Sequence, residues 1–424
     1  MKLLSKKTIS AVLGMATMGA LLFTSCAGGS SSKKSESSDD VIKMGILHSL
    51  SGTMAISEVS LKDVAMMAID EINADGGILG KQIEPVIVDP ASDWDMFAEK
   101  AKELLAKDKV DVTFGCWTSV SRKSVLPVYE EYKGLLFYQV QYEGQEQSPN
   151  IIYTGATPNQ QLIPAAEYLM SEDGGDYKKF YLLGTDYVFP RTANLILKNY
   201  LLAMGVPAAN IIEEYTPFHH QDYQTIVSKI KKFAAEGDAC VLSTINGDSN
   251  VPFYKEFANQ GLSASTCPIM AFSVAEDELR AMDTEFLTGH LAAWNYYESI
   301  KTPENFKFVE KFKKYCESKG LPGGIDRVTD DPIHWTYTAV YLYKKAVEKA
   351  GTTDVEKVIE ALSGLEYQSP GGLVKMDAAN HHLAKPVLIG EIRADGQFDI
   401  ISETEGLINP EPFSQYAKQD IAQN

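Results

Sequence analysis

The sequence predicts an α/β protein with two doubly wound lobes, and three observations lead to this class. The first is length, because 424 residues are too many for one ordinary hydrophobic core and favour two domains. The second is composition, because a hydrophobic content of 45% is typical of a globular chain. The third is a regular alternation of short apolar runs with amphipathic stretches from Val41 onward, which is the pattern of a parallel sheet covered by helices on both faces.

The first half of the chain establishes this alternation. Residues 41–50, VIKMGILHSL, form an apolar run of strand length, and residues 58–75 carry apolar side chains at helical spacing. We expect that helix to end at Gly76 and Gly77, since glycine suits the left-handed position at a helix C-terminus. Further strands are predicted at 83–89, 110–116 and 134–141, with helices at 95–108 and 124–133.

The alternation restarts after residues 150–159, NIIYTGATPN, so the second half is predicted to form another α/β lobe. Two long amphipathic stretches and a β-rich tail follow it. No repeat of about 20–50 residues is present, which excludes a solenoid. Helices are predicted at 164–173, 191–205, 223–237, 250–261, 304–320 and 334–351, and strands at 178–187, 210–217, 239–247, 267–273, 371–377 and 387–401.

Charge and motifs argue against several function classes. The formal net charge of −18 repels nucleic acid and anionic lipid, and no basic run compensates for it. The patterns HExxH, G-x-S-x-G and G-x-G-x-x-G are missing, so we expect no catalytic residues, no cofactor and no metal site. The histidine pairs at 219–220 and 381–382 are poor co-ligands, because adjacent side chains point apart. No regular spacing links Cys116, Cys240, Cys267 and Cys316, so free thiols and disulfides both stay open.

The N-terminus carries an export signal. A short cationic segment, MKLLSKK, precedes an apolar stretch that is too short to span a membrane and has the length of a signal-peptide core. The stretch ends in LFTSC, which resembles the lipobox of bacterial lipoproteins, with Phe23 where leucine is usual. We therefore predict a lipoprotein signal peptide over 1–25, lipidation of Cys26 and a flexible tether over 26–40. The protein is then exported and anchored to the membrane by its lipid, on the periplasmic side or at the cell surface.

Aromatic and hydrogen-bonding side chains gather where predicted strands end. Trp117 follows the run VDVTF, and Tyr187 follows FYLL in the second half. Ligands of open α/β sheets bind at the carboxyl ends of the strands, so we expect these groups to meet. Flat rings with hydroxyl and amide groups suit a small, planar, neutral polar ligand. The candidate binding residues from these clusters are Ser51, Trp117, Thr118, Ser119, Tyr138, Val140, Gln141, Tyr187, Phe189 and Asn246.

A purely structural role is the alternative for individual members of this set. Thr118 or Ser119 would cap the following helix, since hydroxyl oxygens accept hydrogen bonds from free backbone N–H groups there. Trp117 would then fill a gap between a loop and the core. The recurrence of such clusters at several strand ends favours a binding site.

Over residues 41–420 the chain resembles the type I periplasmic binding proteins, the two-lobed receptors that supply ABC importers. INADGGILGKQIEPVIVD is similar to the first helix–turn–strand of that family. GCWTSVSRKSVLPV, YEGQEQSPNIIYTGATPNQ and GTDYVFPR are more similar to one branch, the urea receptors of ABC transporters and the receptors for short-chain amides. The resemblance implies a hinge of three crossings, near Tyr153, Tyr297 and Tyr367, that joins lobe 1 (41–152 and 298–366) to lobe 2 (153–297 and 367–424).

The resemblance also implies which residues contact the ligand. Amide receptors of this branch use an aromatic–Thr–Ser triplet, a Tyr-x-Thr-Pro segment and two tyrosines in a Tyr-x-Tyr-Pro loop. Here Trp117 and Phe189 replace tyrosines and YQVQ replaces Tyr-x-Thr-Pro, and these departures look like the urea receptors. We add Asp331, in the segment TDDPIHW, from its position in the resemblance as an acceptor for ligand N–H groups.

We therefore expect a urea-binding lipoprotein that delivers its ligand to the permease of an ABC importer and is not an enzyme. Urea presents one carbonyl acceptor and several N–H donors in one plane, which Ser119, Tyr138 and Gln141 match in chemistry. The alternatives are a receptor for short aliphatic amides or branched-chain amino acids, and a ligand-sensing regulator. A cytoplasmic regulator would lack the export signal.

Overall fold

The computed structural model describes residues 41–418. The predicted signal peptide (1–25), the lipidation site Cys26 and the tether (26–40) lie outside this range, as do residues 419–424 of the predicted second lobe. None of the helices within the range is both long enough and apolar enough to cross a membrane.

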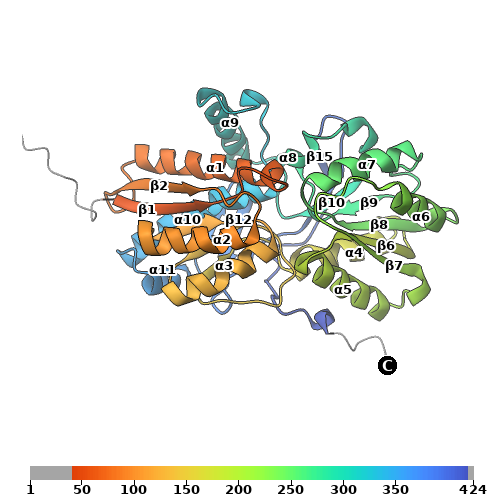
Figure 1. The fold of residues 1–424 in the computed structure, drawn as a ribbon, viewed down its shortest axis with the longest axis horizontal. Helices are drawn as coiled ribbons and strands as arrows, with labels where there is room; N and C mark the ends of the chain where they lie inside the picture. Colours follow the sequence, from red (N-terminus) through yellow and green to blue (C-terminus); the bar gives the residue numbers. More distant parts are fainter. Residues whose placement is uncertain (1–40, 419–424) are drawn as a thin grey trace, which may run out of the picture. The chain divides into compact units, whose positions relative to one another are not determined.

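The first lobe is built on a parallel sheet with the strand order β2-β1-β3-β4-β5 (Figure 1). Across the sheet, the connection from β1 to β2 moves in one direction, and the connections from β2 to β3 and from β3 to β4 move in the opposite direction. Right-handed crossovers therefore place α1 on one face of the sheet and α2 and α3 on the opposite face. The strands are β1 (Val41–Leu47), β2 (Gln82–Val88), β3 (Val112–Gly115), β4 (Leu136–Tyr138) and β5 (Ile151–Tyr153), and the helices are α1 (Ala55–Ala74), α2 (Trp94–Lys102) and α3 (Ser119–Tyr132).

A later part of the chain completes this lobe. The helices α9, α10 and α11 bury their apolar side chains in the same core as β1–β5, and α1 packs against both α9 and α10. Local signals fix the ends of α10, since the Asp330 side chain accepts from the Ile333 backbone N–H and Gly351 follows in the left-handed region at φ 70°. These elements are α9 (Pro303–Ser318), α10 (Asp331–Ala350), α11 (Val355–Leu362) and a small sheet of β11 (Glu366–Ser369), β12 (Gly372–Met376) and β13 (Leu383–Ala384).

The second lobe is built on a mixed sheet with the order β15-β14-β10-β9-β8-β6-β7. Strands β6 to β10 run parallel, and the C-terminal strands β14 and β15 add antiparallel pairs at one edge. Two apolar clusters use residues of these strands, as expected for a sheet with helices on both faces. The strands are β6 (Lys179–Thr185), β7 (Ile211–Thr216), β8 (Ala239–Thr244), β9 (Ile269–Ala271), β10 (Leu291–Trp294), β14 (Leu388–Ile392) and β15 (Phe398–Glu403), with α4 (Leu162–Met170), α5 (Val188–Ala203), α6 (Gln224–Ala234), α7 (Asn250–Asn259) and α8 (Glu276–Leu279).

The structure confirms the two-lobed α/β architecture, but it places the third crossing later than Tyr367. Val374, Met376 and Leu383 pack in the core of the first lobe, and the chain enters the second sheet only at Leu388. The tail segment 366–384 therefore belongs with the first lobe, because its apolar side chains have their partners there.

Hydrogen bonds tie the three crossings together. The Asn295 side-chain amide, after β10, donates to the carbonyls of Gln160 (3.0 Å) and Pro386 (2.7 Å). The buried Lys385 ammonium donates to the Thr154 carbonyl. The three segments thus form one connected hinge.

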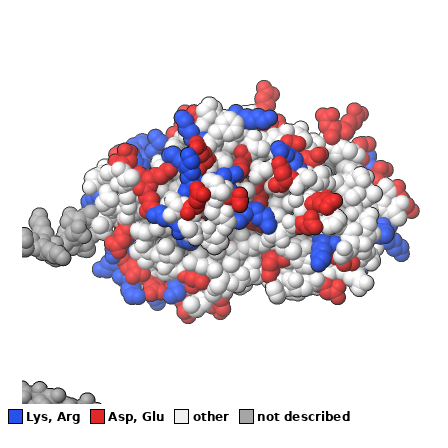
Figure 2. Space-filling model, turned by 90° about the horizontal axis from the view of Figure 1, so that it is seen from above, with Lys and Arg blue, Asp and Glu red and all other residues white. Residues whose placement is uncertain are grey.

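Surface charge on the face that carries α1 and α9 is mixed, with Lys and Arg among Asp and Glu (Figure 2). Lys311 and Lys319 of α9 pair with Glu71 (3.1 Å) and Asp70 (2.8 Å) of α1, so part of this charge holds helices together. The cysteines within the described residues are buried and unpaired, which settles the open choice in favour of free thiols: Cys116, Cys240, Cys267 and Cys316.

Candidate functional site

The backbone before Trp117 is shaped by one close approach between strands and by one left-handed residue. Strand β3 ends at Gly115, where a Cβ atom would lie 2.5 Å from the Leu47 carbonyl oxygen, so only glycine fits beside β1. Cys116 then adopts a left-handed conformation at φ 67°, which is unusual for a residue other than glycine. Such strained positions concentrate at functional sites. This turn places Trp117 at the carboxyl end of the strand.

Trp117 is 3% exposed, and its indole Nε1–H has no partner among the described residues. Thr118 caps α3, since its Oγ1 accepts from the Ser121 backbone N–H at 3.1 Å. For Thr118 the structure therefore provides the capping role that we considered as the alternative. For Trp117 it leaves a buried hydrogen-bond donor that a ligand can use, because buried polar groups in proteins are nearly always paired.

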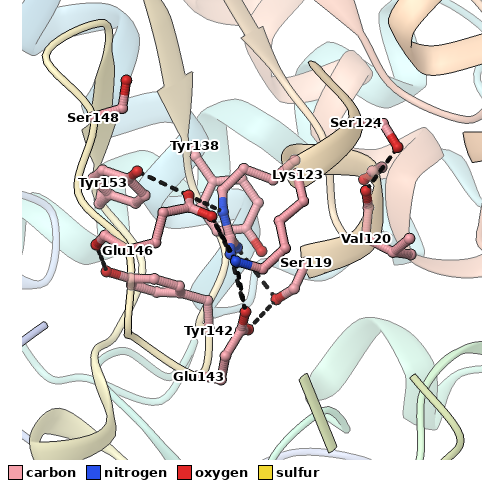
Figure 3. A network of polar contacts seen from close by, with 12 residues as sticks. Ser119, Val120, Lys123, Ser124, Tyr138, Tyr142, Glu143, Glu146, Ser148 and Tyr153 are labelled. Atoms are coloured by element: carbon pink, nitrogen blue, oxygen red, sulfur yellow. Dashed lines mark hydrogen bonds and ion pairs between the residues drawn. The ribbon is translucent and has the colours of Figure 1, made fainter. Parts of the chain in front are cut away.

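Ser119 is the first residue of α3 and faces a carboxylate (Figure 3). Its hydroxyl donates to Oε2 of Glu143, and Arg122 of the same helix donates to Oε1 of Glu143 at 3.2 Å. Arg122 also donates to Ser119 Oγ at 3.2 Å. The hydroxyl expected to donate to a ligand carbonyl is thus used to hold Glu143.

Arg122 neutralises two buried carboxylates. Besides Glu143, it contacts Glu146, with Nε 2.7 Å from Oε1. Burial favours the neutral form of Glu146, but Arg122 and Lys123 outweigh burial and lower the pKa of that carboxyl to about 2. The guanidinium carbon also lies 4.7 Å from the centre of the Tyr138 ring and 4.6 Å from that of Tyr142.

Tyr138 ends β4 and holds two neighbouring segments in place. Its hydroxyl donates to the carbonyl of Trp117 at 2.6 Å, and the carbonyl of Gln141 lies 3.4 Å from the same oxygen. The Tyr138 hydroxyl is therefore committed to the backbone, and it fixes both residues beside it.

Gln141 reaches the second lobe. The strand predicted over 134–141 ends at Tyr138, and the residues after it leave the sheet. This exit lets Nε2 of Gln141 donate to the carbonyl of Phe272 (2.8 Å) and to Ser273 Oγ (3.1 Å), which follow β9. Ser273 in turn donates to Oδ1 of Asn246, after β8, at 2.7 Å. Strand ends of both lobes are thus linked by one chain of hydrogen bonds.

An aromatic chain forms a second link between the lobes. Tyr187 at the start of α5 packs on Phe218 with a centroid distance of 4.8 Å, and Phe218 packs on Trp94 of the first lobe at 5.3 Å. Tyr187 also contacts Phe189, at 6.3 Å. Burial, followed by the nearby Tyr138 and Glu143, raises the pKa of the Tyr187 phenol well above its usual range. Tyr187 therefore lies close to the first-lobe cluster and stays neutral.

Hydroxyl groups of Thr53, two residues before α1, and of Ser57 and Ser60 in α1 form a third link, which we call the latch. Thr53 Oγ1 donates to Asp248 Oδ1 at 2.7 Å, and Ser57 Oγ donates to Glu278 Oε1 at 2.5 Å. Ser60 donates to Asp277. The three donors belong to the first lobe and the three carboxylates to the second, so the lobes are closed on one another.

Three predicted residues do not join this junction as ligand-facing groups. Ser51 is exposed and donates to Asp89 at 3.0 Å, and Val140 packs in the apolar core of the first lobe. The Oδ2 atom of Asp331 accepts from the Asn295 backbone N–H and from Trp335 Nε1, both at 2.9 Å. Because Asn295 is part of the hinge, the structure places Asp331 at the crossings and not beside Trp117.

The sequence prediction did not include Arg122, Glu143, Trp94 or Phe218 in the site. Arg122 and Glu143 carry a visible signal, since YEGQE (142–146) directly follows the strand predicted over 134–141 and SRKS (121–124) lies a few residues after the one predicted over 110–116. No local pattern marks Trp94 or Phe218, because their contact joins segments that are far apart in the sequence. A cavity of about 790 Å³ lies elsewhere, bounded by residues such as Glu130, Asp354 and His381.

Comparisons with known proteins agree with this arrangement. Residues 42–419 match the family model described as "Periplasmic binding protein domain". The chain is 25% identical over 361 residues to the Leu/Ile/Val-binding protein homolog 6 of Brucella melitensis, covering 83% of this chain and 88% of that one. It is 24% identical over 342 residues to the leucine-, isoleucine-, valine-, threonine-, and alanine-binding protein of Pseudomonas aeruginosa, covering 80% and 86%.

Solved structures show the same fold. A solute-binding protein of an ABC transporter from Rhodopseudomonas palustris, in complex with 3,4-dihydroxybenzoic acid, superposes with a TM-score of 0.73 at 21% identity, covering 88% of this chain and 99% of that one. The family is not enzymatic, and its name implies export to the periplasm. With two α/β lobes closed across a hinge and a family match over nearly all described residues, the chain belongs to the periplasmic binding protein family.

Proposed function

We propose that the protein captures urea between its lobes and delivers it to the permease of an ABC importer. The observation that carries the proposal is a pair of complementary buried side-chain groups on Trp117 and Gln141, whose backbone carbonyls both lie within hydrogen-bond distance of the Tyr138 hydroxyl. Trp117 offers a donor, Nε1–H, and Gln141 offers an acceptor, Oε1, and neither atom has a partner among the described residues. A ligand with both a carbonyl oxygen and an N–H group satisfies both atoms, which is the chemistry of an amide or of urea.

Charge balance supports a neutral ligand. The charged residues in contact with Ser119, Arg122 and Glu143, are paired with one another, and the second oxygen of Glu143 accepts from Ser119. An amino acid needs donors for its carboxylate and an anion for its ammonium, and an aromatic acid needs a cation. Both would have to break this buried pair, at a cost of several kcal/mol. Urea and short amides leave it intact.

The size of the ligand sets the expected affinity. Very small ligands gain at most about −1.5 kcal/mol per non-hydrogen atom, so urea with its four such atoms is limited to roughly −6 kcal/mol. That limit corresponds to a dissociation constant on the order of tens of micromolar. Titration calorimetry with urea, acetamide and leucine tests the proposal. We expect urea to bind more tightly than acetamide and leucine not to bind, and binding of leucine alone would overturn the proposal.

The proposal includes a lipid anchor at Cys26. The segment LFTSC and the Gly/Ser-rich residues that follow it support this, and an anchored receptor stays close to its permease. Membrane fractionation of cells that express the wild type or Cys26→Ala tests the anchor, with mass spectrometry of the N-terminal peptide. An unacylated Cys26 on a cytosolic protein would favour a ligand-sensing regulator.

A further inference from the structure

The orientation of the Gln141 side-chain amide is fixed by its partner. The Phe272 carbonyl can only accept a hydrogen bond, so the nitrogen of the amide must face it, at 2.8 Å. The oxygen of the same amide must then point the other way. Ser273 is compatible with this orientation, because its hydroxyl accepts from Gln141 at 3.1 Å and donates to Asn246.

The outward-facing oxygen is buried without a partner. Gln141 is 3% exposed, and Oε1 accepts no hydrogen bond from the described residues. An unpaired buried acceptor weakens the state that contains it by roughly five- to a hundredfold in the equilibrium constant. The closed arrangement therefore gains when a donor from elsewhere reaches Oε1.

The second-lobe partners of Gln141 are held firmly. The Phe272 carbonyl also accepts from Gln161 at 3.2 Å, and Gln161 donates to the Ala293 carbonyl of β10 at 2.8 Å. The contact point for Gln141 is thus tied to the ends of three neighbouring strands, β8, β9 and β10. A hydrogen bond from Gln141 acts on the lobe as a whole and not on a loose loop.

We propose that Gln141 makes lobe closure conditional on a ligand N–H group. The Oε1 atom of its amide accepts a hydrogen bond from the ligand, and the Nε2 atom donates to the second lobe. A ligand with an N–H group pairs Oε1 and so stabilises the hydrogen bonds between Gln141 and the second lobe. A planar carbonyl compound of the same size without N–H, such as acetone, leaves Oε1 unpaired and does not close the lobes. Gln141 is in this sense a specificity-determining residue, and the inference rests on the proposed function.

Gln139 provides a matched control. It lies in the same segment and is fully buried, and its Oε1 also has no partner among the described residues. Its Nε2, however, donates to the Phe137 carbonyl of its own lobe at 2.8 Å. Gln139→Met therefore removes the same chemical group as Gln141→Met without touching the second lobe.

The test compares urea and acetone binding to the wild type, Gln141→Met and Gln139→Met by calorimetry, with closure followed as a decrease in the radius of gyration by small-angle X-ray scattering. We expect the wild type to close on urea and not on acetone. In Gln141→Met the ratio of urea affinity to acetone affinity should fall at least tenfold, and the lobes should not close fully at saturating urea. Gln139→Met should behave as the wild type. Ser273→Ala, which removes one second-lobe partner, should give an intermediate loss and covers the case in which Gln141→Met does not fold.

The outcomes separate the two proposals. If the wild type binds urea and both the preference and the closure persist in Gln141→Met, the role of Gln141 is wrong and the proposed function stands. If the wild type binds acetamide but not urea, the proposed function is wrong, and the same comparison with acetone is made with acetamide, which keeps the N–H group. If the wild type binds neither compound, both proposals fall.

Discussion

The Ser57 hydroxyl of the first lobe donates to Oε1 of Glu278 in the second lobe at 2.5 Å, and the other oxygen of Glu278 accepts from the Ala275 backbone N–H at 3.0 Å. A carboxylate buried between two lobes thus receives one hydrogen bond from each. Opening of the lobes breaks the bond from Ser57 and keeps the one from Ala275. The strength of this contact therefore contributes to the balance between open and closed forms.

Replacement of Ser57 by alanine should weaken ligand binding. Hydrogen bonds to charged groups contribute about 1.5–3 kcal/mol, so the affinity for urea should fall by roughly ten- to 150-fold, mainly because the open form becomes more populated. Calorimetry measures the affinity. Ser124→Ala is the control, since the Ser124 hydroxyl donates only within α3, to the Val120 carbonyl at 3.0 Å. Equal affinities of the two variants would exclude a role for the latch in closure.

Ligand affinity should depend on pH through Glu278. Burial raises the pKa of Glu278 to about 7, with a further contribution from Asp277, although the bond from Ser57 lowers it. In the open form the carboxyl is more hydrated and has a pKa nearer its usual value of about 4.3. Closure then takes up a proton, so affinity should increase as the pH falls from about 8 towards 5. Binding measured over this range in Glu278→Gln, which cannot titrate, should show a flatter profile; an unchanged slope would contradict the assignment.

Loss of Arg122 should destabilise the fold. Arg122→Met leaves Glu143 and Glu146 buried without their cation, and breaking a buried pair in this way costs about 3–5 kcal/mol. Lys123→Met is the matched control, because Lys123 contacts the same carboxylates but its side chain is 38% exposed. We expect the control to cost less than about 1 kcal/mol. Because urea is the proposed ligand, the free energy of unfolding should be measured with guanidinium chloride and not with urea as the denaturant.

The indole N–H of Trp117 should contribute to ligand binding and not to stability. Trp117→Phe keeps an aromatic ring but removes the five-membered ring of the indole, with a donor that has no partner among the described residues. The affinity for urea should fall by about three- to tenfold, and the melting temperature should fall less than in Trp294→Phe. Trp294→Phe should show the opposite effect. Its Nε1–H donates to the Val274 carbonyl at 2.9 Å, and its loss leaves a buried acceptor unpaired. A loss of stability in Trp117→Phe with unchanged affinity would show that the indole is structural.

Asp331→Asn should act through the hinge. Burial raises the pKa of Asp331 to about 6 and lowers that of the neighbouring Lys385 to about 7, and each charge opposes the effect on the other. The substitution removes the negative charge that stabilises the buried Lys385 ammonium, while the asparagine oxygen can still accept from Asn295 and Trp335. We expect a loss of about 2–4 kcal/mol in the free energy of unfolding. The affinity of the folded fraction for urea should change less than in Trp117→Phe. A larger change would indicate that Asp331 contacts the ligand.

The sequence was sufficient to predict most helices and strands, because these depend on local periodicity, but β5, β10, β11 and α11 were not predicted and the strand predicted over 134–141 ends at Tyr138. Trp117, Tyr138 and Tyr187 lie where the alternation of strands and helices placed them. Which side chains bond to one another could not be predicted, since the pairing of Ser119 with Glu143 or of Gln141 with Phe272 depends on the packing of distant segments. The third crossing was placed near Tyr367 from the family resemblance, and it lies later because Val374 has its apolar partners in the first lobe.

The discontinuous construction of both lobes has a consequence for biosynthesis. Core residues of the first lobe extend to Leu383, and the sheet of the second lobe is complete only with β15, which ends at Glu403. A ribosome must therefore have made nearly the whole chain before either lobe can acquire its full set of contacts. Neither lobe can therefore be completed for most of the synthesis, which favours the unfolded state that a secretion channel requires of its cargo.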